Sequence, residues 1–254
     1  MYKVYKLLAY LYLFFIGILF GCKKDELSTP NNPAIDSPKG ILKLHLHTFI
    51  GESEVDAYNI DYLNEEGRKI SLNMAQLYIS DIQLVKLDGS LCSLGDKTIL
   101  KFFESETSTV GDVPVGNYKS IRFRVGINSF AGSDSLIFKE PSMWFSSQAN
   151  KEEYVYLNVQ GKIDTSLSLS GFMAPFCYRI GTTGNNIQVI MPDKNFTVLK
   201  DQIQYVHMLI DYSKIFNGIQ LNNSLNLSVN SINDNSLQLA VQVKNNIPLM
   251  FKYE

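Results

Sequence analysis

Histidine, tryptophan and cysteine are scarce in this chain, which has three, one and three of them among 254 residues. Three histidines limit any catalysis by imidazole, and the chain lacks the Gly-x-Ser-x-Gly, His-Glu-x-x-His, Cys-x-x-Cys, phosphate-loop and EF-hand patterns. An excess of one charge is missing too, because 23 basic and 25 acidic residues give a formal net charge of -2. Such a balance offers no general attraction to nucleic acid. The sequence therefore predicts a protein that is not an enzyme and does not bind nucleic acid.

A hydrophobic run long enough to cross a membrane is also absent. The apolar stretch at 7–20 has roughly 14 residues, whereas a membrane-spanning helix needs about 20. Lys3 and Lys6 precede this stretch and Gly21-Cys22 follows it, an order that predicts an export signal at 1–21. Cys22 resembles the cysteine of the bacterial lipobox, which is acylated and becomes the first mature residue. The alternative is an ordinary signal peptide or anchor in which Cys22 is incidental.

Lipidation of Cys22 predicts the protein's location. The lipid, rather than electrostatic attraction, would hold a protein of this small net charge to a membrane. We therefore predict a membrane-anchored lipoprotein of the bacterial cell envelope, attached to the outer membrane. The acidic pair Asp25-Glu26 resembles the surface-export signals of some Gram-negative lipoproteins, which favours exposure at the cell surface.

The segment 22–39 is polar and contains three prolines, so it has too few apolar groups to repay ordering. We predict a flexible tether there and one folded domain at 40–254. A composition of 45% hydrophobic residues allows this domain a full core without disulfides. Cys92 and Cys177 either form one disulfide in an oxidising compartment or remain separate thiols.

Apolar and polar residues alternate with a period of two in several segments, which indicates strands with one buried face. The residues predicted to face the core are Leu42, Leu44, Leu46, Ile121, Phe123 and Val125. Further strands are predicted at 76–87, 153–162, 187–191, 204–211, 225–229 and 237–243. No segment has a convincing helical stripe, although 213–217 is suited to a single turn. Turn-forming residues separate the strands, so the sequence predicts an all-β, antiparallel, immunoglobulin-like β-sandwich.

His45 and His47 are the candidate metal ligands. Residues two apart in a strand point to the same face about 6.6 Å apart, so both imidazoles can reach one ion, and imidazole suits copper and zinc. Two unconnected, solvent-facing histidines are the simpler alternative. His207 lies on the polar face of its strand, and by itself it is more typical of a surface histidine than of a third ligand. Trp144, the sole tryptophan, belongs either to a functional site or to a plug at one end of the sandwich.

Several short motifs follow one another along the chain. They are Leu44-His45-Leu46-His47-Thr48-Phe49-Ile50-Gly51, Tyr62-Leu63-Asn64-Glu65-Glu66-Gly67, Tyr78-Ile79-Ser80-Asp81-Ile82, Val113-Pro114-Val115-Gly116-Asn117-Tyr118, Phe123-Arg124-Val125-Gly126-Ile127-Asn128 and Met143-Trp144-Phe145. In this order they resemble the MbnP-like copper-binding family, which comprises exported bacterial β-sandwich proteins that are often lipoproteins. The resemblance implies a copper ligand at His47.

The departures from the family pattern fall where its metal chemistry is expected. Arg179 stands where the family commonly has a histidine, and an arginine cannot act as a neutral ligand. Trp144 is single where the family has a pair, Asn128 replaces an aspartate, and residues 251–254 include no terminal histidine. The resemblance therefore implies a degenerate or rebuilt copper site that is weaker than the family's. Such a site centres on His47 with help from His45.

The leading function is accordingly a membrane-anchored, exported binding lipoprotein with copper as the implied ligand. The alternative is a surface adhesion or glycan-binding module without metal, in which Tyr154, Tyr156 and Trp144 stack on sugar. Convergence of other ligand-type side chains on His47 favours metal, and isolation of His47 favours a partner surface.

Overall fold

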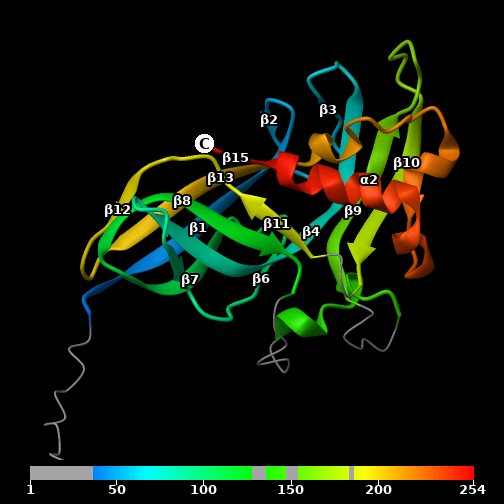
Figure 1. Cartoon of the computed structure of the whole chain (residues 1–254). Coiled ribbons are helices and arrows are strands. Elements are labelled where there is room, and N and C mark those ends of the chain that lie inside the picture. The colour runs from blue at the N-terminus through cyan, green and yellow to red at the C-terminus, as the bar shows by residue number, and fades with distance from the viewer. Residues whose placement is uncertain (1–36, 128–135, 147–153, 183–185) are drawn as a thin grey trace, which may run out of the picture. The chain divides into compact units, whose positions relative to one another are not determined.

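The computed structural model describes residues 37–127, 136–146, 154–182 and 186–254 (Figure 1). The predicted signal peptide, Cys22, most of the predicted tether and Asn128 lie outside the described residues. Within the described ranges, no helix combines the length and the apolar character needed to cross a membrane. The first strand begins at Lys39, close to the predicted start of the domain.

The described residues form two sheets, which confirms the all-β sandwich prediction. The first sheet has the order β15-β13-β1-β2, with β7 also paired to β1. Its strands are β1 (Lys39–Ile50), β2 (Ser53–Glu54), β7 (Thr107–Pro114), β13 (Ile203–Asp211) and β15 (Phe251–Tyr253). The second sheet has the order β11-β8-β4-β9-β10-β14, with β12 on β8 and with β3, β5 and β6 on β4. Its strands are β3 (Tyr62–Leu63), β4 (Lys69–Lys86), β5 (Leu91–Ser93), β6 (Ile99–Lys101), β8 (Gly116–Val125), β9 (Val155–Asp164), β10 (Met173–Gly181), β11 (Ile187–Ile190), β12 (Phe196–Val198) and β14 (Ser228–Val229).

The alternation along β1 determines which side chains reach the core. Leu42, Leu44 and Leu46 have no exposed surface, whereas His45 and His47 lie on the opposite, outer face of the sheet. The same pattern in β8 buries Ile121, Phe123 and Val125, so all six predicted core residues are confirmed. These side chains belong to one apolar cluster that contains residues of both sheets.

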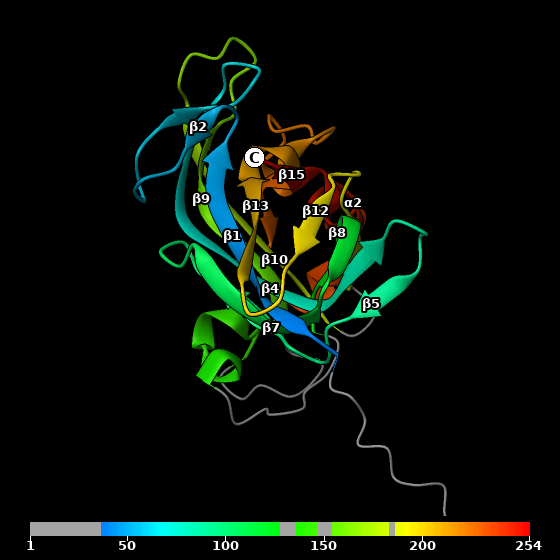
Figure 2. The same ribbon diagram turned by 90° about the vertical axis from the view of Figure 1, so that its left-hand side faces the viewer.

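The pairing of β1 with β13 is parallel, with Leu44 opposite Val206 and His45 opposite His207. Figure 2 shows the two strands side by side. Most other pairs in the described structure are antiparallel, as predicted, but β10 and β14 are parallel as well. A parallel pair needs a long crossover, and the chain between β1 and β13 provides one because it builds most of the second sheet.

The strand predicted at 237–243 is wrong, because these residues lie mainly in the helix α2 (Gln238–Asn246). Apolar residues at every second position from 237 to 243 resemble a strand, but burial follows a helical spacing. Ala240, Val243 and Ile247 are buried, whereas Leu237 and Val241 are exposed. The helix packs near β10 (Figure 1).

The remaining helical elements are short. They are η1 (Leu136–Lys139), η2 (Pro141–Met143), η3 (Tyr212–Phe216), η4 (Ser224–Leu227), η5 (Asn233–Ser236) and η6 (Ile247–Met250). The turn predicted at 213–217 corresponds to η3. The strand predicted at 225–229 is reduced to the two residues of β14, because Asn223 accepts a hydrogen bond from the backbone of Leu225 and begins η4.

The two cysteines of the described structure are free thiols, so the disulfide considered for them is not formed. Cys92 lies in β5 and Cys177 in β10. Burial raises the pKa of the Cys177 thiol, which keeps that group protonated at neutral pH.

Candidate metal centre

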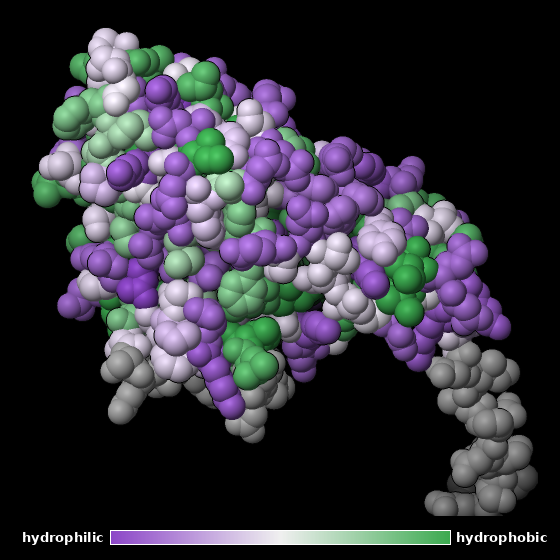
Figure 3. Space-filling view, turned by 180° about the vertical axis from the view of Figure 1, so that it is seen from behind, coloured by the Kyte–Doolittle hydropathy of each residue, from purple (hydrophilic) through white to green (hydrophobic). Residues whose placement is uncertain are grey.

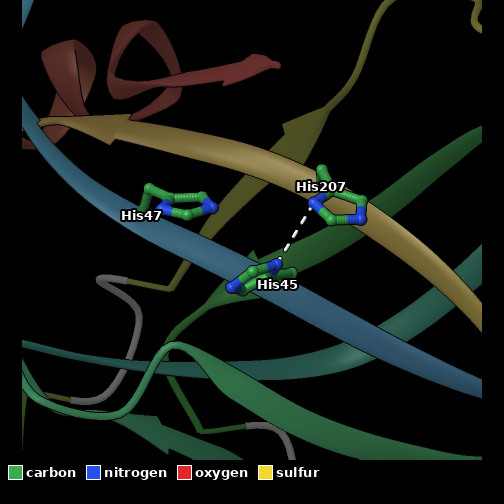
Figure 4. Close-up of side chains that lie close together, drawn as sticks. All are labelled: His45, His47 and His207. Atoms are coloured by element: carbon green, nitrogen blue, oxygen red, sulfur yellow. Dashed lines mark hydrogen bonds between the residues drawn. The ribbon is translucent and has the colours of Figure 1, made fainter. Parts of the chain in front are cut away.

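Three imidazoles lie together on the outer face of the first sheet (Figure 4). His45 and His47 come from β1, and His207 comes from β13. Because His45 and His207 are register partners in neighbouring strands, their side chains emerge on the same face. The ring centroids of His45 and His47 are 4.3 Å apart, and those of His45 and His207 are 4.8 Å apart. The cluster thus contains all three histidines of the chain.

The spacing of the nitrogen atoms suits one metal ion. One ligand atom from each histidine lies within 4.8 Å of the other two. The Nδ1 atoms of His45 and His207 are 3.2 Å apart, so in the metal-free state one of them donates to the other. A tetrahedral ion with bonds of about 2.0–2.1 Å separates its nitrogen ligands by about 3.3 Å. The His45–His207 pair is already at that separation.

A carboxylate contacts each imidazole. Glu106 Oε2 lies 3.3 Å from His45 Nε2, and Glu54 Oε1 lies 2.6 Å from His47 Nδ1. Glu254 Oε2 lies 3.3 Å from His207 Nδ1 and 3.8 Å from His47 Nε2. Carboxylates in positions such as those of Glu106 and Glu54 fix the tautomer and the orientation of metal-binding imidazoles.

These contacts indicate which nitrogen each histidine offers. Glu106 engages Nε2 of His45 and leaves Nδ1 toward His207, and Glu54 engages Nδ1 of His47 and leaves Nε2. His207 can offer Nδ1, next to Glu254, once its proton moves to Nε2. The side chain of His207 is 44% exposed. The arrangement therefore supplies three nitrogen donors, with a carboxylate oxygen beside two of them.

Each carboxylate reaches the cluster from a different segment. Glu54 is in β2 and pairs with Phe49 of β1, and Glu254 follows β15 and donates its backbone N–H to the carbonyl of His207. The carbonyl of Glu106 accepts from the backbone N–H of Leu46, between the two histidines of β1. None of these acidic residues is predicted from the sequence, because no local pattern around them indicates a site.

The structure brings the predicted candidates His45 and His47 together and adds His207. His207 lies on the polar face of its strand, as predicted, but its pairing with β1 makes it part of the cluster. The sequence could not show this, because the two strands are about 160 positions apart in the chain and each has an ordinary alternating pattern.

Trp144 lies elsewhere. Its indole Nε1 donates to the carbonyl of Phe138 at 3.2 Å, and its ring packs against a second, smaller apolar cluster. That cluster comprises Tyr78, Leu100, Ile127, Phe138, Met143, Tyr154 and Tyr156. These contacts favour the plug over a site. Tyr154 and Tyr156 are buried, with 7% and 2% exposure, so neither is available to stack on a sugar.

Arg179 is in β10 of the second sheet and contacts the surroundings of Trp144. Its guanidinium donates to the carbonyl of Trp144 and lies 5.3 Å from the ring centroid of Phe145. A weaker contact of 3.4 Å reaches Asn230. The positive charge of Arg179 is therefore directed at these groups and not at the histidines.

The fold and the histidine cluster define an all-β sandwich protein with a candidate metal centre on an outer sheet face. A family model described as MbnP matches residues 39–234, and the chain belongs to this family. The family is associated with metal binding, of copper in particular. Among solved structures, the chain is similar to MbnP from Methylosinus trichosporium, with 13% identity and a TM-score of 0.47. The likeness covers 70% of this chain and 78% of that one, and no curated protein matches the chain.

Proposed function

We propose that this protein binds one divalent transition-metal ion, copper(II) above all, through His45, His47 and His207. The observation that carries the proposal is the convergence of three imidazoles from two strands, with donor atoms within 4.8 Å. The donor set contains nitrogen and oxygen, which suits Cu(II) and Zn(II), whereas Cu(I) prefers sulfur. Among divalent ions of the first row, Cu(II) binds most tightly to such ligands. The site is thus a rebuilt version of the one that the family resemblance implies.

Titration of the purified protein with Cu(II), Zn(II) and Cu(I), each against a chelator of known affinity, tests the proposal. We expect binding of one Cu(II) that is tighter than binding of Zn(II) or Cu(I). The variants His45→Ala, His47→Ala and His207→Ala should each weaken it by at least about tenfold, since even outer-shell partners contribute 10–100-fold. Glu52→Gln is the matched control, because Glu52 is an exposed carboxylate in the turn between β1 and β2. Tight binding that survives all three histidine substitutions would refute the site.

We further propose that the protein acts by binding rather than catalysis and that it is an exported lipoprotein anchored through Cys22. The basic start, the short apolar stretch and Gly21-Cys22 support this. Replacement of Cys22 by Ser should leave an unprocessed or soluble form, as judged by metabolic labelling with a fatty acid and by fractionation. Protease treatment of intact cells tests exposure on the outer membrane. Normal lipidation of the Cys22→Ser variant would contradict the assignment of Cys22 as the lipidated residue.

The adhesion or glycan-binding alternative has less support. Two of its three candidate aromatic residues are buried. On the face shown in Figure 3, hydrophilic side chains predominate and apolar ones form separate small groups. A larger continuous apolar patch would mark a partner-binding site, and the described residues on this face show none. If the purified protein binds no metal, that result would favour this alternative.

A further inference from the structure

Lys101, the last residue of β6, is a buried lysine next to the segment that reaches the histidine cluster. Its exposed fraction is 1%, and its backbone pairs with Leu77 of β4. The Nζ atom donates to the carbonyls of Phe102 at 2.5 Å and Phe103 at 3.2 Å. Burial lowers the pKa of this amine to about 8, while Glu106 and Glu104 act in the opposite direction. The group therefore remains an ammonium at neutral pH.

The chain after Lys101 turns back toward β1. The backbone N–H of Phe102 donates to Ser105 Oγ at 3.2 Å, and the backbone N–H of Ser105 lies 3.4 Å from the carbonyl of Phe102. Glu106 follows, and its carbonyl accepts from the N–H of Leu46 at 2.8 Å. Its side chain ends 3.3 Å from His45 Nε2. A continuous set of contacts thus joins the buried ammonium to one imidazole of the cluster.

A buried charge at this position needs an explanation. Removing an ammonium from water costs several kcal/mol, and an apolar residue of similar volume would avoid that cost. The two carbonyl contacts of Lys101 are local, so they hold the turn at 102–105 rather than a distant part of the fold. The position of this turn determines where Glu106 lies. What the ammonium stabilises is therefore this turn, which leads directly to Glu106.

We propose that Lys101 is a positioning residue for the metal centre. Its ammonium holds the turn at 102–105, which leads to Glu106, and the side chain of Glu106 reaches His45. Glu106 then keeps the proton of His45 on Nε2, which leaves Nδ1 free to bind metal. The expected effect of Lys101 on metal binding rests on the proposed function. The effect of Lys101 on the tautomer of His45 is expected in the metal-free protein.

The test compares Lys101→Met with Lys101→Arg, which retains the charge, and with Lys97→Met, an exposed lysine near the start of β6. Nitrogen NMR of the metal-free protein reports the tautomer of His45. We expect Lys101→Met to increase the fraction protonated at Nδ1, Lys101→Arg to restore most of the wild-type signal, and Lys97→Met to leave it unchanged. An unchanged His45 signal in folded Lys101→Met would overturn the proposal, whether or not the protein binds metal.

Cu(II) titration provides the second measurement. Lys101→Met and Glu106→Gln should each weaken binding by about tenfold, at the lower end of outer-shell effects. If Lys101 acts through Glu106, the affinity of the double variant for Cu(II) is no lower than the lower of the two single-variant affinities. Losses that multiply in the double variant would exclude this route. If Lys101→Met does not fold, Ser105→Ala decides, because it removes the side-chain contact that closes the same turn. An unchanged His45 signal in this variant would contradict the role of the turn. Failure of the wild type to bind metal refutes the proposed function and leaves the NMR result standing.

Discussion

Each imidazole of the cluster has its own carboxylate partner, and this pairing determines how the site balances charge. Ionised Glu54, Glu106 and Glu254 bring three negative charges close to three imidazoles. A divalent ion offsets two of these charges, so the repulsion among the carboxylates is weaker with the metal than without it. The carboxylates therefore favour binding of a cation in addition to orienting the rings.

Lys101 gives a residue-scale prediction about pH. Its pKa is 10.5 in an unfolded chain and about 8 in the folded protein. Between these values the unfolded chain binds more protons than the folded protein, so the contribution of Lys101 to the free energy of unfolding rises as pH rises from about 8 to 10.5. A pKa difference of 1 corresponds to about 1.4 kcal/mol, so a fall from 10.5 to about 8 limits the rise to about 3–4 kcal/mol.

Chemical denaturation of the wild type and of Lys101→Met across this window measures the effect. The difference in unfolding free energy, wild type minus variant, isolates Lys101, because other titrating groups such as the tyrosines contribute to both proteins. This difference should increase with pH. A difference that stays constant from pH 8 to 10.5 would show that the amine is not held in a buried state.

At the scale of elements, β1 has two functions on its two faces. Its inner face places three leucines in the core, and its outer face carries two ligands of the candidate site. The end of the strand is fixed by Asp211, whose Oδ1 accepts from the backbone N–H of Gly51 and from Ser213. Gly51 has a φ of +59°, and a Cβ there would lie 2.7 Å from the carbonyl oxygen of Leu63. These contacts explain structurally why the glycine follows the histidine motif and why Asp211 begins η3.

Truncation of a β1 leucine should show how strongly the core holds this strand. Leu44 has no exposed surface and is adjacent to His45, so Leu44→Ala leaves a cavity and should cost about 2–5 kcal/mol of unfolding free energy. Ile41→Ala is the control on the same strand, because Ile41 is 37% exposed and an exposed truncation usually changes stability by about 0.5 kcal/mol. Equal losses in the two variants, measured by denaturant unfolding, would contradict the burial pattern.

The sequence predicted those parts of the fold that depend on local pattern. Alternation identified the buried face of β1 and β8, and it placed His45 and His47 on one face. It failed for α2, where alternation and a helical stripe coincide over a short segment and the contact with β10 decides. It also could not supply His207, because strand pairing across about 160 residues depends on the register of the whole sheet and leaves no local trace. The carboxylates were missed for the same reason.

On the scale of the whole molecule, the features that the family resemblance associates with metal are divided between the two sheets. His47 lies with His45 and His207 on the first sheet, whereas Arg179 and Trp144 contact each other at the second. The replacement of a family histidine by Arg179 is therefore compatible with a metal site in this protein. The arginine has its own contacts there, and the proposed site takes its ligands from β1 and β13.

A metal ion bound in this way joins two neighbouring strands, so it should stabilise the whole sandwich. A ligand that binds only the folded state at 100 times its dissociation constant adds about 2.7 kcal/mol to the free energy of unfolding. For a domain of this size that corresponds to an increase of roughly 5–10 °C in Tm, since each kcal/mol shifts Tm by about 2–4 °C. We expect Cu(II) to produce this increase and a chelator to reverse it.

His207→Ala distinguishes a bridging ion from one held by β1 alone. This variant keeps His45 and His47 on one strand but removes the ligand from β13, so Cu(II) should raise its Tm by much less than that of the wild type at the same concentration. Glu52→Gln should respond as the wild type does, because its carboxylate does not contact the cluster. A full increase in Tm in His207→Ala would show that the ion does not connect the two strands, and the three-histidine centre would then be wrong even if copper binds.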